Sequence, residues 1–378
     1  MKKLFALVLA LSMLALAACG TTGNNSGTIA TPGVPASTPP ESPERVVVQF
    51  EALTKTVESD DGVTVLTYTV PQVTVTLDDA DTAKKITDDI NSMLTPDQAA
   101  IDELAGRASD AYAALDEAQR ETWAPYGITV TAEVTRGDSS VLSLYCTRSQ
   151  MSGGAHPANS SFGLNYDIAT GDKLTAEQLA SDTGMLEETV AGFVKEAAAG
   201  NENASAFYGV DDFANNALSG SSWYFSASGI TVFADPEVIA PYAQGTVVFT
   251  VPYSSLTSSL KAAYFPDKLI GGDDAFTISS GANGTDVSAV IDEDGVGFKL
   301  TAMEDVTGVS IDRVSMGSDG EYLVSGQVLY VSRLASGEDL GLTAAFMDMP
   351  LYSVSWGSNE HLLIGDSGKD GSLLLMEP

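Results

Sequence analysis

Basic residues are scarce in this chain. Its 378 residues include 18 lysines and arginines against 51 aspartates and glutamates, a formal net charge of −33 at pH 7. A surface with this charge repels the phosphate backbone of nucleic acids, so we expect no nucleic-acid partner. It also repels anionic lipid headgroups and does not by itself hold the protein on a membrane. It attracts cationic partners and divalent ions, although solubility alone is an equally good reason for it.

Histidine and cysteine are almost absent, with two of each. The usual patterns of zinc proteases, phosphate-binding loops and dinucleotide-binding folds are missing, as is the Gly-x-Ser-x-Gly turn of serine hydrolases. The sequence therefore predicts no catalytic residue and no cofactor, and it leaves metal binding open.

An apolar run long enough to cross a bilayer is missing as well. The run from Leu4 to Leu16 is shorter than the ~20 residues that a membrane span needs. It follows Lys2 and Lys3 and precedes small residues, which is the layout of a secretion signal. Its end, Leu16-Ala17-Ala18-Cys19, resembles the lipobox of bacterial lipoproteins, where the Cys thiol carries diacylglycerol and the chain is cut just before it. We therefore expect residues 1–18 to be a lipoprotein signal peptide and lipidated Cys19 to anchor the protein on the extracytoplasmic face of the cell membrane.

Composition and periodicity divide the rest of the chain. Residues 19–44 are rich in Gly, Thr, Ser and Pro and predict a flexible linker. Residues 45–150 combine strands with helices and predict an upstream α+β domain. Its expected elements are strands at 46–50, 66–70, 73–77, 128–135 and 141–148, and a helical region over 79–122 that breaks at 95–97.

Residues 151–260 predict a second α+β domain, and residues 275–378 predict only short strands between Gly, Asp and Ser turns. Gly271-Gly272 is interpreted as a linker between them. The expected elements of the second domain are strands at 162–168, 223–225, 229–233 and 246–251, a helix that starts at Thr175 and one over 185–199. The predicted fold is thus a two-part α+β domain with antiparallel sheets, followed by a small C-terminal all-β domain of sandwich or barrel type.

Two segments resemble a known family. The first contains Gly153-Gly154-Ala155-His156 and then Asp167-Ile168-Ala169-Thr170-Gly171, and the second contains Ile239-Ala240-Pro241-Tyr242. In this order they are similar to the extracytoplasmic domain of unknown function of the lysozyme-sensing anti-sigma-V factor, which also accompanies a peptidoglycan deacetylase. Residues 45–150, with Val70-Pro71-Gln72-Val73 and Asn91, resemble the domain that precedes it in that family. The resemblance implies an α+β fold and a role in the cell envelope, and it implies no reaction.

Three residues are candidates for ligand binding. His156 lies in a glycine-containing loop and is able to ligate a metal or transfer a proton, or it caps a tight turn. Trp223 and Tyr242 offer flat faces for stacking on sugar rings, as do Tyr224 and Tyr253, or they pack in the core. Asp292-Glu293-Asp294-Gly295 is only a partial calcium loop, and a hairpin turn explains it better. Cys146 has no partner for a disulfide once Cys19 is lipidated, and we expect a buried free thiol.

The preferred hypothesis from the sequence is a noncatalytic, lipid-anchored envelope protein that binds a wall component or a cationic secreted protein such as lysozyme. The alternatives are an enzyme that modifies peptidoglycan, with His156 as base or ligand, and a structural spacer.

The anchor is directly testable by replacing Cys19 with alanine. Because Cys19 is the only anchor that the sequence predicts, the Cys19→Ala chain should leave the membrane or stay uncleaved. Membrane fractionation and immunoblotting measure both outcomes. Normal processing and full membrane retention of Cys19→Ala would show that the lipobox interpretation is wrong.

Overall fold

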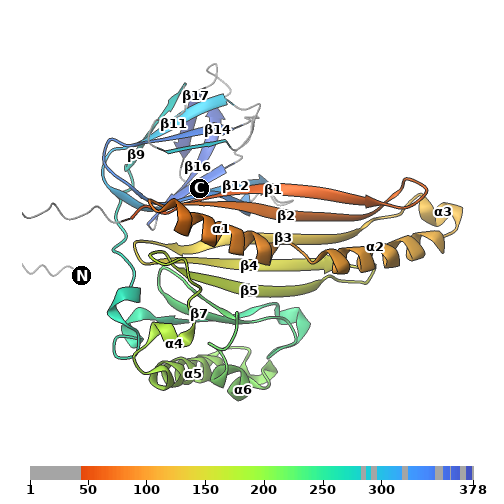
Figure 1. The fold of residues 1–378 in the computed structure, drawn as a ribbon, viewed down its shortest axis with the longest axis horizontal. Coiled ribbons are helices and arrows are strands. Elements are labelled where there is room, and N and C mark those ends of the chain that lie inside the picture. The colour runs from red at the N-terminus through yellow and green to blue at the C-terminus, as the bar shows by residue number, and fades with distance from the viewer. Residues whose placement is uncertain are drawn as a thin grey trace, which may run out of the picture. The chain divides into compact units, whose positions relative to one another are not determined.

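Strands dominate the fold. In this computed structural model we describe residues 44–281, 287–290, 296–316, 322–344, 352–357, 359–366 and 372–376. The strands of the first sheet (Figure 1) are β1 (Val47–Glu58), β2 (Thr64–Thr76), β3 (Tyr126–Gly137), β4 (Val141–Met151), β5 (Ala158–Asp167), β12 (Val306–Met316), β13 (Tyr322–Leu334), β15 (Tyr352–Trp356), β16 (Asn359–Asp366) and β17 (Ser372–Met376). Their order across the sheet is β17-β16-β15-β12-β13-β1-β2-β3-β4-β5. Every pairing in it is antiparallel except that of β2 with β3.

Two smaller sheets complete the strand structure. One has the order β10-β14-β11-β9, built from β9 (Phe276–Ser280), β10 (Val287–Val290), β11 (Val296–Ala302) and β14 (Asp339–Ala344). The other has the order β6-β7-β8, built from β6 (Trp223–Phe225), β7 (Gly229–Ala234) and β8 (Val247–Pro252). The helices are α1 (Ala80–Leu94), α2 (Gln98–Ala113), α3 (Glu117–Arg120), α4 (Ala176–Leu179), α5 (Thr183–Gly200) and α6 (Val210–Asn215). No helix within the described ranges has the length and apolar character that a membrane crossing requires.

The apolar side chains form three cores. The first lies between strands β1–β5 and helices α1 and α2. The second lies between the four-stranded sheet and the strands from β12 to β16. The third contains helices α4–α6 and sheet β6–β8. Alternation along β1 connects the first two, because Val46 and Val48 belong to the first core and Val47 to the second.

The predicted α+β class is confirmed, and all elements after residue 275 that the structure describes are strands. The division into separate parts is not confirmed. Val47 pairs with Val331, so β13 from the C-terminal stretch continues the same sheet as β1, and the described residues lie in one compact unit, 43–378. Gly271 is packed rather than loose, because a Cβ there would lie 2.9 Å from the Trp356 ring. The acidic run at 292–295 falls outside the described residues.

The sequence predicts separate strands at 66–70 and 73–77, but the structure has one strand, β2, which runs through Pro71. Pairing of β2 with β3 ends at Thr69. Beyond that point helix α1 binds the free strand edge: Asn91 accepts from Val73 N at 2.8 Å and donates to Val73 O at 2.7 Å. Since residues 71 and 73 have the same orientation, the missing N–H of Pro71 faces this unpaired edge, where proline costs no ladder bond.

The contact between β5 and β6 depends on Gly163. A Cβ at this position would lie 1.8 Å from the carbonyl oxygen of Trp223, and Gly163 N donates to Ser221 O at 2.6 Å. The third core therefore packs against the first sheet through direct contact between the backbones of β5 and β6. Only glycine at position 163 allows the two backbones to approach this closely.

We predict that Gly163→Ala lowers the free energy of unfolding by about 3 kcal/mol or more, because β6 must move away from β5. Gly127→Ala in β3 is the matched control, since the nearest atom to its added Cβ is 3.9 Å away. Its effect should stay within about 1 kcal/mol. Urea unfolding of both variants measures the difference, and equal midpoints would contradict the proposed contact.

Candidate functional site

Two of the three predicted ligand-binding residues meet in the structure. His156 is exposed in the loop between β4 and β5, and its ring lies 4.2 Å from that of Tyr242 at an interplanar angle of 33°. The Tyr242 hydroxyl donates to Pro157 O at 3.1 Å, which fixes the loop against the segment between β7 and β8. This contact gives His156 a structural role, and ligand binding there stays a prediction. No cluster of three or more His, Cys, Asp or Glu side chains in the described ranges is placed to hold a metal ion.

The third predicted residue, Trp223, lies in the core. Only 1% of its surface is exposed, and its indole N–H donates to Gly220 O at 3.2 Å. This location favours the packing role that the sequence left open. The Cys146 prediction is confirmed, since the cysteine is free and fully buried. Burial raises the pKa of its thiol, and the nearby Glu133 charge raises it further, which favours the protonated thiol over the nucleophilic thiolate.

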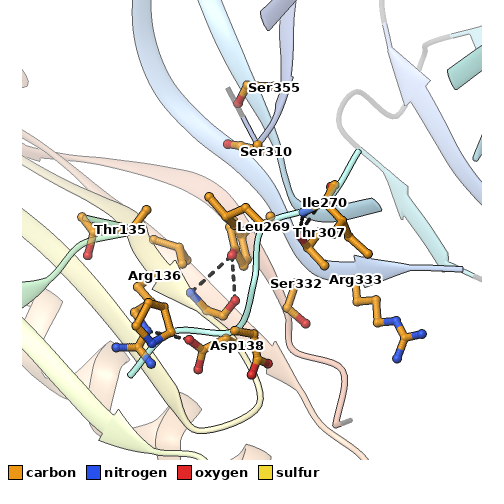
Figure 2. A pocket seen from close by; sticks show the side chains of 18 of the residues that line it. Thr135, Arg136, Asp138, Leu269, Ile270, Thr307, Ser310, Ser332, Arg333 and Ser355 are labelled. Atoms are coloured by element: carbon orange, nitrogen blue, oxygen red, sulfur yellow. Dashed lines mark hydrogen bonds and ion pairs between the residues drawn. The ribbon is translucent and has the colours of Figure 1, made fainter. Parts of the chain in front are cut away.

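The structure contains a cavity of about 630 Å³ that the sequence did not reveal. It lies at the turn between β3 and β4, and the segment 266–270 and strands β12 and β13 complete its wall. Figure 2 shows Arg136 and Asp138 on the β3–β4 side, and Ser310 and Ser355 on the side of β12 and β15. Ser310 and Ser355 both belong to the 275–378 stretch and lie far in sequence from the turn. The cavity and the His156 loop lie at opposite ends of β4. The length of this strand places them ~33 Å apart.

A buried ion pair forms the base of this cavity. The Arg136 and Asp138 side chains are only 3% and 10% exposed, and Arg136 Nε lies 2.6 Å from Asp138 Oδ2. Arg136 Nη1 also donates to the Tyr253 hydroxyl at 2.8 Å and to Tyr264 O at 2.7 Å. Asp138 Oδ1 accepts from Ser140 N and Val141 N, each at 3.0 Å. Because these charges are paired and hydrogen-bonded, they serve as a rigid wall and not as reactive groups.

Tyr330 of β13 closes the same turn from the other side. Its hydroxyl donates to Gly137 O at 2.8 Å, and burial raises its pKa. A Cβ on Gly137 would lie 2.5 Å from the Tyr330 ring, so glycine is required for this approach. The sequence predicts Arg136 to Ser139 only as the connection between the expected strands at 128–135 and 141–148, because local pattern does not show what packs on a turn.

Three carboxyl groups with raised pKa values line the cavity, those of Glu44, Glu133 and Asp312. Asp312 on β12 has its pKa raised to about 6, chiefly by burial; the hydrogen bond that it accepts from Ser310 opposes this shift, and the Glu360 charge adds to it. Burial also raises the pKa of Glu133 on β3, and the Asp312 charge adds to that rise. The only sequence signal was an isolated acid in each of two strands. Since 179 positions separate Glu133 and Asp312, pattern analysis alone had no means to pair them.

One stretch of the chain is similar to a family of unknown function. Residues 177–254 match the model of a family described as a protein of unknown function, DUF3298. A DUF3298 family crystal structure from Bacteroides fragilis NCTC 9343 is 15% identical, with a TM-score of 0.42, over 57% of this chain and 94% of that one. Another from Pseudomonas aeruginosa PAO1 is 16% identical, with a TM-score of 0.35, over 58% of this chain and 97% of that one. No curated protein matches this chain.

We predict that Asp312→Asn stabilises the protein at high pH. Asp312 has a higher pKa in the folded chain than the ordinary value of 3.8. Its contribution to stability is therefore fully present below pH ~4 and is lost as pH rises through about 6. Asparagine cannot ionise, so the variant should gain about 1–3 kcal/mol over the wild type at pH 8 and nothing at pH 4. Urea unfolding across this range, with exposed Asp110→Asn on α2 as control, measures the gain. A gain that is the same at both pH values would contradict the burial of this charge.

Proposed function

We propose that this protein is a lipid-anchored module of the cell envelope that binds a wall component or a cationic secreted protein, with the β3–β4 cavity as its binding site. The cavity carries the proposal. Its volume, about 630 Å³, is within the usual range for ligand sites, and such sites combine apolar walls with a few polar groups. Leu269 and Ile270 supply the apolar wall, and Glu133 and Asp312 supply the charge.

The charge of the chain supports a cationic partner. Without residues 1–18, and so without Lys2 and Lys3, 16 basic residues stand against 51 acidic ones, a net charge of −35. Such a field accelerates encounter with basic proteins, although charge alone gives contacts that salt weakens. A shaped cavity adds contacts that salt does not screen, and it is the feature that makes the binding specific.

A specific observation also supports the alternative function, an enzyme that modifies peptidoglycan. Glu133 and Asp312 line one cavity, and both have raised pKa values. General acid catalysis at neutral pH needs carboxyl groups of this kind. Release of soluble fragments from purified peptidoglycan by the wild-type protein, but not by Asp312→Asn, would favour the enzyme over the binding module.

Filling the cavity should remove binding. Ala227 lines it from the turn between β6 and β7 and is exposed, so tryptophan there blocks space without entering a core. We predict that the full-length protein in mild detergent binds lysozyme or purified peptidoglycan at physiological salt. Ala227→Trp should weaken this binding about tenfold or more.

The control is Ala100→Trp on the exposed side of α2, which should bind like the wild type. Sedimentation with peptidoglycan and titration with lysozyme measure the two ligands. Binding that disappears between low and physiological salt, or that Ala227→Trp leaves unchanged, would contradict the cavity as the binding site.

A further inference from the structure

The polar face of strands β12 and β15 supplies one side of the cavity. Ser310 is paired with Ser355, and Asp312 with Ser353, so these four side chains point to the same face of the sheet. The intervening residues Ile311 and Val354 point to the second core. Asp312 is thus held on a rigid strand, in register with hydroxyl groups.

One of these hydroxyls has no partner. Ser353 is 1% exposed, and its Oγ makes no hydrogen bond in the part of the chain that the structure describes. A buried hydroxyl without a hydrogen bond is costly. Ser353 is directly across from Asp312 but is not among the residues that line the cavity, so the hydroxyls of this face that reach the cavity are those of Ser310 and Ser355.

Of the cations that line the cavity, the two arginines are paired with carboxylates and the lysine is exposed to solvent. Arg136 is paired with Asp138, and Arg333 with Asp305 at 3.4 Å. Lys268 lies on the exposed segment 266–270. The charges that act on Asp312 and Glu133 are instead negative: Glu360 of β16 acts on Asp312, and Asp312 acts on Glu133. This end of the cavity therefore concentrates negative charge against an apolar wall.

We infer that the Glu133–Asp312 end of the cavity binds a positively charged nitrogen, an ammonium or guanidinium group, whose apolar body lies against Leu269 and Ile270. The inference rests on the proposed binding function and specifies the ligand chemistry. An N–H cation donates several hydrogen bonds at once, which suits two carboxylates and the Ser310 and Ser355 hydroxyls that line the same wall. A ligand of this kind would also supply the positive charge, since the charges of the described residues that act on Glu133 and Asp312 are negative. Affinity should rise from pH 5 to pH 7.5, as Asp312 ionises.

The test compares two probes of nearly equal shape, phenethylamine and 2-phenylethanol, by calorimetric titration into the full-length protein in mild detergent. We expect the amine to bind about tenfold more tightly than the alcohol at pH 7.5. The difference should disappear in the double variant Glu133→Gln, Asp312→Asn. The double variant Glu121→Gln, Glu188→Gln removes the same charge from exposed positions outside the cavity and should keep the difference.

The relative affinities of the two probes decide whether this end of the cavity selects a cation. Equal affinity of the two probes for the wild type, or a preference for the amine that survives Glu133→Gln, Asp312→Asn, would overturn the inference. The proposed function is assessed separately with Ala227→Trp. Suppose that Ala227→Trp loses lysozyme or peptidoglycan binding while the wild type binds both probes equally. This result would support the proposed binding function and reject only the cationic ligand.

Discussion

The buried pair of Arg136 and Asp138 is the contact on which the arrangement of the three cores depends. Through Arg136 the β3–β4 turn holds Tyr253 and Tyr264 of the third core region, and through Gly137 it holds Tyr330 of β13. Removal of either charged partner would leave the other buried and unpaired, which usually costs more than the pair itself contributes. The turn therefore fixes the positions of segments that lie more than 100 positions apart in the sequence.

Strands β2 and β3 separate beyond Thr69, and this separation leaves space beside the β3–β4 turn. Pairing of β2 with β3 covers only Leu66–Thr69, and the side chain of Asn91 then takes the place of a strand partner for Val73. The second half of β3 is free to turn toward β13, where Gln327 Oε1 accepts from Val134 N at 2.7 Å. Helix α1 and strand β13 thus each hold one side of the opening, and the cavity lies where β3 and β13 meet.

This arrangement relates the charge of the protein to its proposed site. Acidic residues over the whole surface favour encounter with a cation, while half-buried Asp312, with exposed Glu133 nearby, shares a cavity with an apolar wall that strengthens a single contact. The first effect is weakened by salt, and the second is much less so. The His156–Tyr242 contact belongs to the opposite end of β4, and its packing maintains a loop far from the cavity.

The sequence by itself determined the α+β class, the helices over 79–122 with their break at 95–97, the 223–233 hairpin and the buried state of Cys146, because periodicity and turn residues act locally. It also predicted the lipid anchor, which depends on a short motif. Tertiary structure alone decided that β13 joins β1, that Pro71 lies within one strand and that Trp223 is a core residue. It alone also brought Glu133 to Asp312 and Arg136 to Tyr253. Those outcomes depend on contacts between distant segments and on which strand edge is left unpaired, and no local pattern in the sequence records either.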